Sequence, residues 1–378
     1  MRAYVYTDKS LERYAGRFVW LSVNTEDAKN APFLKRYPIP ALPTILVLDP
    51  RRDVVALRYL GGATVPQLKK MLDDVESRYR ARALSTADAM LEKADELASA
   101  GNHTAAAKEY DVALAAGSRS WRGFGRAAES LLFELSMGDD QERCATRAIS
   151  LYPLLKGTSS GANVASTGLS CAASLAKTVA KRNEYLAALE KATREAFDDK
   201  KITLSGDDRS GLYMALIDAR DATGDDEGAI ALKAQWAAFL ESAAASAKTA
   251  EQRAVYDSHR LSAYLDLGTP QKAIPMLEES ERDFPNDYNP PARLAMAWKA
   301  LKDYDKALAA SDRAMSKIEG PRRLSVLSVR ADIFTAKGDA KAARETIATA
   351  LEYAKSLPEG QRSDGRIKGL EKRLASMQ

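Results

Sequence analysis

Residues 38–49 read Pro38-Ile39-Pro40-Ala41-Leu42-Pro43-Thr44-Ile45-Leu46-Val47-Leu48-Asp49, and this stretch decides how the N-terminal region folds. A proline-rich turn leads directly into the apolar run Ile45–Leu48, which is short enough to be a buried strand. Turn-forming residues occupy positions 49–53, and Val54–Leu60 is another β-rich run. Because the connection between the two runs is short, we expect them to pair as an antiparallel hairpin.

Helical and strand patterns flank this hairpin on both sides. Before it, residues 2–15 have a helical pattern, Phe18–Val23 is a compact β-rich run, and a short helix over Ala31–Tyr37 stops at the proline-rich turn. After the hairpin, Val65–Ser77 is predicted to be an amphipathic helix. Its apolar face carries Leu68, Met71, Leu72 and Val75.

The order of these elements, together with the motif Leu42-Pro43-Thr44, resembles the later part of a thioredoxin-like fold over residues 1–80. In that family the proline of a hydrophobic-Pro-Thr motif is cis, and such bonds are uncommon outside specific turns. The resemblance implies an incomplete α/β domain in which the backbone of Leu42, Pro43 and Thr44 docks an extended substrate chain.

The sequence differs from that family at the position of the family's redox-active cysteines. The redox reaction needs a Cys-x-x-Cys pair at the start of the helix that corresponds to residues 2–15, and this segment contains no cysteine. We therefore predict no catalytic residue in the chain as it stands. Two explanations stay open: the domain has degenerated, or the gene product begins upstream and carries the cysteines. In the second case the protein is a thiol–disulfide oxidoreductase whose helical region selects substrates.

From about Ser85 onward the sequence becomes alanine-rich and continuously helical in its periodicity. Turn signals recur every 34 to 44 residues, and alanines follow the turns at fixed offsets. These alanines are Ala106, Ala229, Ala273, Ala307 and Ala343, five residues after a turn, and Ala113, Ala314 and Ala350, twelve after. The turns are Gly101-Asn102, Gly138-Asp139, Arg182-Asn183, Gly224-Asp225, Gly268-Thr269, Lys302-Asp303 and Gly338-Asp339.

This pattern resembles tetratricopeptide repeats (TPRs), in which small residues let paired helices cross closely. The predicted fold is therefore mainly α: a TPR-type solenoid of about seven helix pairs over residues 85–358, after the small α/β domain of residues 1–80. Residues 359–378 are expected to contain a polar capping helix, and the Gly- and Ser-rich residues 157–168 a loop.

A repeat of this kind implies a protein–protein interaction scaffold, whose partner is a protein or peptide bound in a groove lined by the first helix of each pair. Side chains of the first helices look neutral to mildly acidic, which suits a partner segment of basic character. In the first pair, Leu91 and Asp95 take groove positions. The other candidates are Met214, Asp218, Asp221, Val255, Ser258, Ser262, Leu265, Met296 and Asp332.

Composition excludes several other classes of function. The net charge of +4 comes from interspersed basic and acidic residues, which argues against nucleic-acid binding. No apolar run is long enough for a membrane span, and we expect no cofactor and no metal. Cys144 and Cys171 are expected to be buried as small apolar side chains. Whether they pair stays open, and a disulfide would need their Cα atoms within about 7 Å. The sequence as given suggests a cytoplasmic protein, or a periplasmic or secreted one if a signal peptide precedes it.

Overall fold

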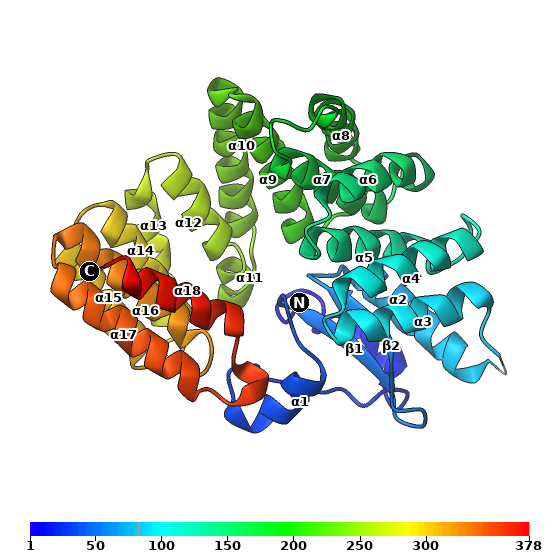
Figure 1. Cartoon of the computed structure of the whole chain (residues 1–378), viewed down its shortest axis with the longest axis horizontal. Helices are drawn as coiled ribbons and strands as arrows, with labels where there is room; N and C mark the ends of the chain where they lie inside the picture. Colours follow the sequence, from blue (N-terminus) through cyan, green and yellow to red (C-terminus); the bar gives the residue numbers. More distant parts are fainter. Residues whose placement is uncertain (82, 378) are drawn as a thin grey trace. The chain divides into compact units, whose positions relative to one another are not determined.

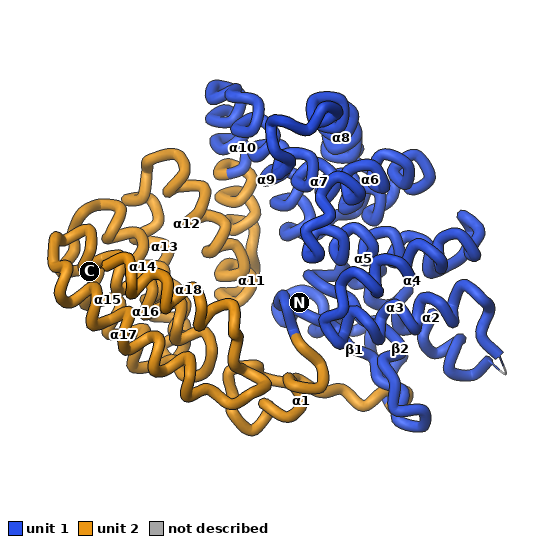
Figure 2. The backbone as a smooth tube through the Cα atoms, viewed as in Figure 1, with its two compact units in different colours: residues 1–15, 39–236 blue, residues 16–38, 237–378 orange. Residues whose placement is uncertain are grey.

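The computed structural model describes residues 1–81 and 83–377, and these divide into two compact units (Figures 1 and 2). Unit 1 comprises Met1–Ala15 and Ile39–Trp236, and unit 2 comprises Gly16–Pro38 and Ala237–Gln378. The chain is mainly α-helical, with one small β-hairpin near its beginning. Most helices pack against the next helix in the sequence and are joined to it by a short turn, as predicted for a helical repeat.

The hairpin of unit 1 forms where the sequence predicts it. Strands β1 (Thr44–Asp49) and β2 (Val54–Leu60) pair antiparallel, with Thr44 opposite Leu60 and a register shift between Val47 and Leu48. Helix α2 (Val65–Arg80) follows, and a reciprocal pair of hydrogen bonds between Thr64 and Gln67 caps its start. The predicted apolar face of this helix is confirmed, since Leu68, Met71, Leu72 and Val75 are all buried.

Two predictions for the first 23 residues are wrong. The segment 2–15 is not an α-helix but a series of turns that ends in the 3-10 helix η1 (Lys9–Tyr14), where Asp8 accepts a hydrogen bond from the Ser10 N–H. Phe18–Val23 is not a strand, and within the described residues the sheet has two strands. A β-rich run forms a strand only when it finds a partner edge, and here Val19 and Leu21 are 88% and 80% exposed.

The rest of unit 1 is a succession of helix pairs. Neighbouring helices in sequence pack on each other, and the predicted turns separate α3 from α4, α5 from α6 and α9 from α10. In the third pair the connection runs over residues 175–181, slightly before the predicted turn. The helices are α3 (Thr86–Ser99), α4 (His103–Ala116), α5 (Phe124–Met137), α6 (Gln141–Leu155), α7 (Ser159–Ser174), α8 (Arg182–Asp198), α9 (Gly206–Thr223) and α10 (Asp226–Ala245), the last of which continues into unit 2.

The prediction of a loop at residues 157–168 is wrong, because most of this stretch belongs to α7. The glycines of α7 allow it to pack closely against α6. A Cβ atom on Gly168 would lie 2.2 Å from the Cβ of Ala148 on α6, and one on Gly161 would lie 2.3 Å from the carbonyl oxygen of Leu155. Glycine is therefore required where α6 and α7 approach each other, and its frequency here does not indicate a loop.

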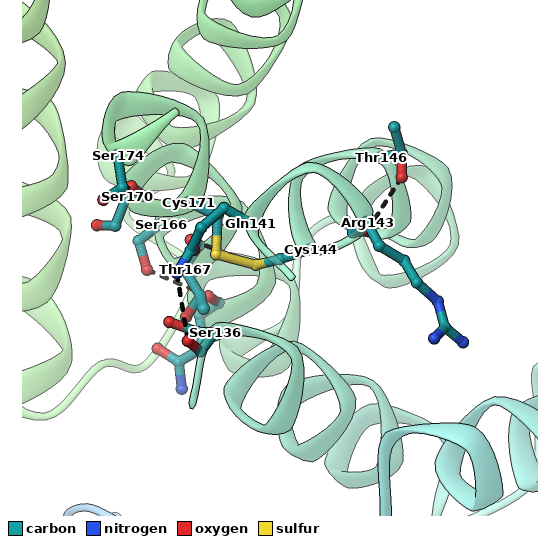
Figure 3. The surroundings of a disulfide bond; sticks show 11 residues. Ser136, Gln141, Arg143, Cys144, Thr146, Ser166, Thr167, Ser170, Cys171 and Ser174 are labelled. Atoms are coloured by element: carbon teal, nitrogen blue, oxygen red, sulfur yellow. Dashed lines mark hydrogen bonds between the residues drawn. A yellow bond between two sulfur atoms is a disulfide. The ribbon is translucent and has the colours of Figure 1, made fainter. Parts of the chain in front are cut away.

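Cys144 on α6 and Cys171 on α7 form a disulfide bond, with their Cα atoms 6.1 Å apart (Figure 3). Both side chains are buried, as expected, but the two sulfur atoms are bonded to each other instead of being free thiols. The bond fixes the second helix of one pair to the first helix of the next. Polar side chains of α7, among them Ser166, Thr167 and Ser170, lie around it.

Unit 2 contains three further helix pairs and a terminal helix. The predicted turns at Gly268-Thr269, Lys302-Asp303 and Gly338-Asp339 each separate two paired helices. The elements are α11 (Ala250–Ala254), α12 (Asp257–Asp266), η3 (Pro270–Lys272), α13 (Ala273–Asp283), α14 (Asn289–Ala300), α15 (Tyr304–Met315), α16 (Arg323–Lys337), α17 (Ala340–Ser356), η4 (Glu359–Gln361) and α18 (Asp364–Ala375). The predicted small-residue positions are confirmed in both units, because all eight alanines named above are at most 1% exposed.

Residues 16–38 belong to unit 2, although they lie near the beginning of the chain. They contain η2 (Ala28–Asn30) and the predicted short helix α1 (Ala31–Arg36). The carboxylate of Glu26 accepts the Arg322 backbone N–H at 2.8 Å, at the start of α16. Gly360 of η4 lies so close to α1 that a Cβ atom there would be 1.9 Å from the carbonyl oxygen of Ala31. This segment is thus an integral part of unit 2.

Candidate functional site

Strand β2 covers part of the first-helix surface of unit 1, where it contacts α3 and α5. The guanidinium of Arg58 donates to Glu134 of α5 at 2.7 Å, and both side chains are almost completely buried. Glu134 also binds the Nδ1 atom of His103 at 2.6 Å. His103, at the start of α4, is 25% exposed and thus connects the buried Arg58–Glu134 pair to the surface.

A second buried network of charged and polar side chains surrounds Asp95, on the first helix of the first pair. Arg126 of α5 donates to both carboxylate oxygens of Asp95, at 2.9 and 2.7 Å, and to the backbone oxygen of Arg58 at 3.2 Å. The Tyr110 hydroxyl donates to Asp95 at 2.6 Å. The placement of Leu91 and Asp95 in an open groove is therefore wrong, since both are 0% exposed. Strand β2 and helix α5 enclose the surface that the repeat register assigns to a partner.

The motif Leu42-Pro43-Thr44 lies at the open end of the hairpin. The Leu42–Pro43 peptide bond is cis, as the resemblance to thioredoxin-like proteins implies. Leu42 is 48% exposed, whereas the Pro43 carbonyl already accepts the Gly61 N–H at 2.8 Å. The Thr44 hydroxyl donates to the backbone oxygen of Ala41 at 2.6 Å. The role of these three residues in docking an extended chain stays a prediction.

Beside this end of the hairpin, three consecutive first helices contribute polar side chains that lie together. We call Tyr59, Glu129, Asn163 and Asp208 the polar cluster. They come from β2, α5, α7 and α9 respectively. The Asn163 side-chain nitrogen donates to Glu129 at 3.1 Å, and Asn163 also hydrogen-bonds Asp208. Gly62, just after β2, lies close to Asp207, which precedes Asp208 in the sequence. The Asp207 carboxylate would be 3.1 Å from a Cβ atom at Gly62.

Burial changes the protonation behaviour of the polar cluster. Desolvation raises the pKa of Glu129, and the negative charge of Asp208 raises it further. Desolvation likewise raises the pKa of Asp208, although hydrogen bonds from Ser205 and Asn163 oppose the shift. The pKa of Tyr59 is raised by burial and by the charges of Glu129 and Asp208. Both carboxyl side chains nevertheless remain partly accessible to solvent.

The sequence did not single out any member of the polar cluster. Glu129 and Asn163 lie on the first helices of the second and third pairs, for which no groove positions are predicted, and Asp208 lies on α9 ahead of the predicted positions Met214, Asp218 and Asp221. The usable signal is a carboxylate within an apolar stretch of helix, which Glu129 provides between Ala127, Ala128 and Leu131. Buried carboxylates are rare without a partner.

The predicted groove residues divide between the two units. In unit 1, Met214 is 38% exposed and Asp218 is exposed on α9, while Asp221 forms an ion pair with Lys233 of α10 at 3.3 Å. In unit 2, Ser258 and Ser262 on α12 and Met296 on α14 are exposed. Val255 is 37% exposed, and Leu265 is half-buried.

Asp332 of α16 forms an ion pair with Arg373 of α18 at 2.6 Å, and its side chain remains 43% exposed. Two surface hollows lie away from all of these residues. One, of about 430 Å³, is lined by residues of α2 and by Arg122, and the other, of about 270 Å³, lies between α6 and α8. Within the described ranges we found no group of His, Cys, Asp and Glu side chains that could hold a metal ion. Nor does any described helix have the length and apolar character needed to cross a membrane.

Comparison with known proteins gives little guidance. No family model matches this sequence, and no curated protein matches it either. Among solved structures, the chain is similar to a thermophilic TPR protein of Thermus thermophilus, with 17% sequence identity and a TM-score of 0.28. The alignment covers 77% of this chain and 98% of that chain. A TM-score this low supports no conclusion about fold or function.

Proposed function

We propose that this protein is a protein–protein interaction scaffold of the TPR type, which holds peptide segments of partners on its first helices. The observation that carries the proposal is the contact between first helices of successive pairs. In unit 1, α5 contacts α7 and α7 contacts α9, and in unit 2, α12 contacts α14 and α14 contacts α16. Each unit thus has a continuous surface made of first helices, which we call its first-helix face.

The side chains on these faces suit peptide binding. In unit 2 the face carries hydroxyl groups at Ser258 and Ser262 and an exposed thioether at Met296. Methionine adapts its shape to different partners, and hydroxyl groups can donate or accept hydrogen bonds. In unit 1, Met214 and Asp218 lie on α9, the same helix that contributes Asp208 to the polar cluster.

The first 80 residues have a structural role in this proposal. Strand β2 covers α3 and α5, and residues 16–38 complete unit 2. The domain limits of 1–80, 85–358 and 359–378 remain part of the proposal, with α18 as the cap. The oxidoreductase alternative draws no support from these residues, since the two cysteines of the sequence are bonded to each other inside the helical region.

Selection from a random peptide library on the immobilised full chain tests the proposal. We expect peptides to be enriched, and synthetic copies to bind the purified protein with a defined stoichiometry. Glutamate substitutions on the faces, Met214→Glu in unit 1 and Met296→Glu in unit 2, should each weaken the peptides that bind that unit. A matched control is Ile230→Glu on the second helix α10, because Ile230 is 58% exposed and lies off the first helices. Failure to enrich any peptide, or equal losses in the control, would refute the scaffold function.

The disulfide favours an oxidising compartment for this protein, such as the periplasm or the cell exterior, over the cytoplasm. Buried disulfides persist where thiols are not kept reduced, and the Cys144–Cys171 bond lies in the interior of unit 1. Thiol labelling under denaturing conditions, on protein purified from its natural source, tests this assignment. We expect no reactive thiol before reduction and two after it; two thiols before reduction would place the protein in a reducing compartment.

A further inference from the structure

The run Phe18–Val23 of unit 2 carries the two most exposed large apolar side chains among the described residues. Val19 and Leu21 are 88% and 80% exposed, and Val23 is 37% exposed. The run contains neither a charged residue nor a proline. Natural proteins usually protect an exposed strand-forming segment with such residues, because the segment can otherwise pair with another chain. The run is therefore suited to pairing with a strand from a second molecule.

The backbone of the run has one open edge. The run forms neither a helix nor a turn, and the rings of Phe18 and Trp20 lie 6.3 Å apart, as side chains two residues apart do in an extended chain. In the part of the chain that the structure describes, Val19, Leu21 and Val23 form no hydrogen bond. Because the N–H and C=O groups of alternate residues in an extended chain point to the same side, these three residues present a single edge without partners.

The three open residues are placed symmetrically about Leu21. If a second copy of the run lies antiparallel to the first, Val19 of one copy is opposite Val23 of the other, and Leu21 is opposite Leu21. Opposite residues of this kind exchange two backbone hydrogen bonds. Each open residue thus meets another open residue, and no like charges face each other within the run. A symmetric contact of this type closes as a dimer.

We propose that a second copy of this chain covers the run Phe18–Val23, and that the two runs pair antiparallel across a two-fold axis at Leu21. The dimer is independent of the scaffold function, because the run belongs to neither first-helix face. Six paired residues bury little surface compared with a standard protein interface, so the dimer is weak and its population rises with protein concentration.

Sedimentation velocity of the full chain over a range of concentrations measures this association. We expect the natural protein to form a concentration-dependent dimer. Leu21→Asp and Leu21→Lys should each remain monomeric, because like charges then lie opposite each other across the axis. An equimolar mixture of the two variants should restore a dimer that contains one copy of each. Leu21 is exposed, so both variants should fold, and thermal unfolding checks this.

The matched control substitutions are Ile230→Asp and Ile230→Lys on α10. Ile230 is another exposed apolar residue, at 58%, and it lies outside the run. Both control variants should dimerise as the natural protein does. Loss of the dimer in the controls would mean that overall charge, and not pairing at Leu21, governs the association, and would overturn the proposal.

Disulfide cross-linking tests the register of the two runs. The Cα atoms of opposite, hydrogen-bonded residues in an antiparallel pair are about 5.5 Å apart, which suits a disulfide. Leu21→Cys should therefore form a covalent dimer on oxidation. Val19→Cys should not cross-link to itself, because the two copies of this position lie about 13 Å apart along the strands, but it should cross-link to Val23→Cys in a mixture. Cys144 and Cys171 are bonded to each other and do not compete.

Three further results would overturn the proposal. The first is a natural protein that is monomeric at every concentration, and the second is a dimer that persists in both Leu21 variants, which would place the contact elsewhere. The third is a mixture of the two variants that stays monomeric, since the run would then pair with a different segment, such as β1 of another copy. Cross-linking of Val19→Cys to itself would likewise exclude the antiparallel register.

Discussion

Glu134 joins elements that lie far apart in the sequence. Its carboxylate is 0% exposed and binds both Arg58 of β2, 76 residues earlier, and His103 at the start of α4. Such a pair is not in itself strong evidence for stability, because desolvation offsets much of the attraction. Its role is positional, since it fixes the hairpin on α5 in one arrangement.

Removing one member of this pair should therefore be costly, while removing both should not. We expect Glu134→Leu to lower the free energy of unfolding by about 3–5 kcal/mol, because Arg58 is left buried and uncompensated. The double variant Arg58→Met, Glu134→Leu should recover most of that loss. Urea unfolding followed by circular dichroism measures both, and equal losses in the single and double variants would contradict this explanation.

The raised pKa of Glu129 predicts that its contribution to folding stability falls as the pH rises, whereas the contribution of an ordinary ion-paired carboxylate increases. The unfolded chain releases the Glu129 proton near the ordinary value of 4.5, whereas the folded protein keeps it to higher pH. The folded state binds more protons in that window, so this group stabilises the fold fully below the unfolded pKa and loses that contribution as pH rises through the folded pKa.

Glu129→Gln removes this titration. We expect the variant to gain stability relative to the natural protein as the pH rises from the ordinary carboxyl pKa of 4.5 through the raised pKa of Glu129, and the difference to level off above it. Urea midpoints measured at several pH values for both proteins test this, with Glu96→Gln as a control that should show no such trend. A constant difference at all pH values would mean that Glu129 ionises normally.

Helix packing depends on where the sequence places its glycines. Gly168 lies where α6 and α7 are in contact, and a methyl group there would overlap Ala148. Gly211 lies on α9, and beyond the nearby backbone of that helix no atom of the described residues is within 4 Å of the position that a Cβ would take. We expect Gly168→Ala to destabilise the protein by about 1–3 kcal/mol through overpacking, and Gly211→Ala to stabilise it by up to about 1 kcal/mol through helix propensity. The two effects have opposite signs, and thermal unfolding distinguishes them. If both substitutions changed the stability in the same direction, overpacking would not determine the effect at Gly168.

The disulfide acts at the same crossing of α6 and α7. Its cysteines are 27 residues apart, and closing a loop of that length in the unfolded chain corresponds to about 3.5 kcal/mol of stabilisation. We expect reduction to lower the stability by about this amount, and Cys144→Ala, Cys171→Ala to show a similar loss with no further response to reductant. A natural protein whose unfolding is insensitive to reductant would contradict a structural role for the bond.

Elements could be predicted from the sequence where the signal is local. Helical periodicity and turn residues located nearly all helix pairs, and alternation with a short turn located the hairpin. The predicted strand at Phe18–Val23 does not form, because a strand needs a partner that local sequence does not reveal. The predicted loop at residues 157–168 is wrong because the glycines there allow α7 to contact α6. The polar cluster and the Arg58–Glu134 pair could not be predicted, since each joins residues from elements far apart along the chain.

At the scale of the whole molecule, the chain enters unit 2 with residues 16–38, returns to unit 1, and enters unit 2 again after Trp236. The early segment is held within unit 2 by Glu26 at the start of α16, by the ion pair of Lys35 with Glu359, and by the close contact of Gly360 with α1. Unit 2 is therefore built from two pieces of sequence that are separated by nearly the whole of unit 1.

This arrangement predicts that residues 16–38 stay bound after the chain is cut. With protease sites inserted at the 15/16 and 38/39 boundaries, the released peptide should co-elute with the remainder in size-exclusion chromatography. Gly360→Ala should release it, because a Cβ atom would meet the backbone of α1, whereas Gly365→Ala should not, since its nearest neighbouring atom would be 3.9 Å away. Dissociation of the peptide from the protein without a glycine substitution would contradict the account of unit 2.

Hydrogen exchange of the full chain, with and without a saturating selected peptide, tests the central claim most directly. If the first helices form the binding surface, amide protection should increase on α5, α7 and α9, or on α12, α14 and α16, and stay unchanged on the second helices of the same pairs. Protection confined to second helices, or no change in any helix while the peptide is bound, would contradict a scaffold that works through its first-helix faces.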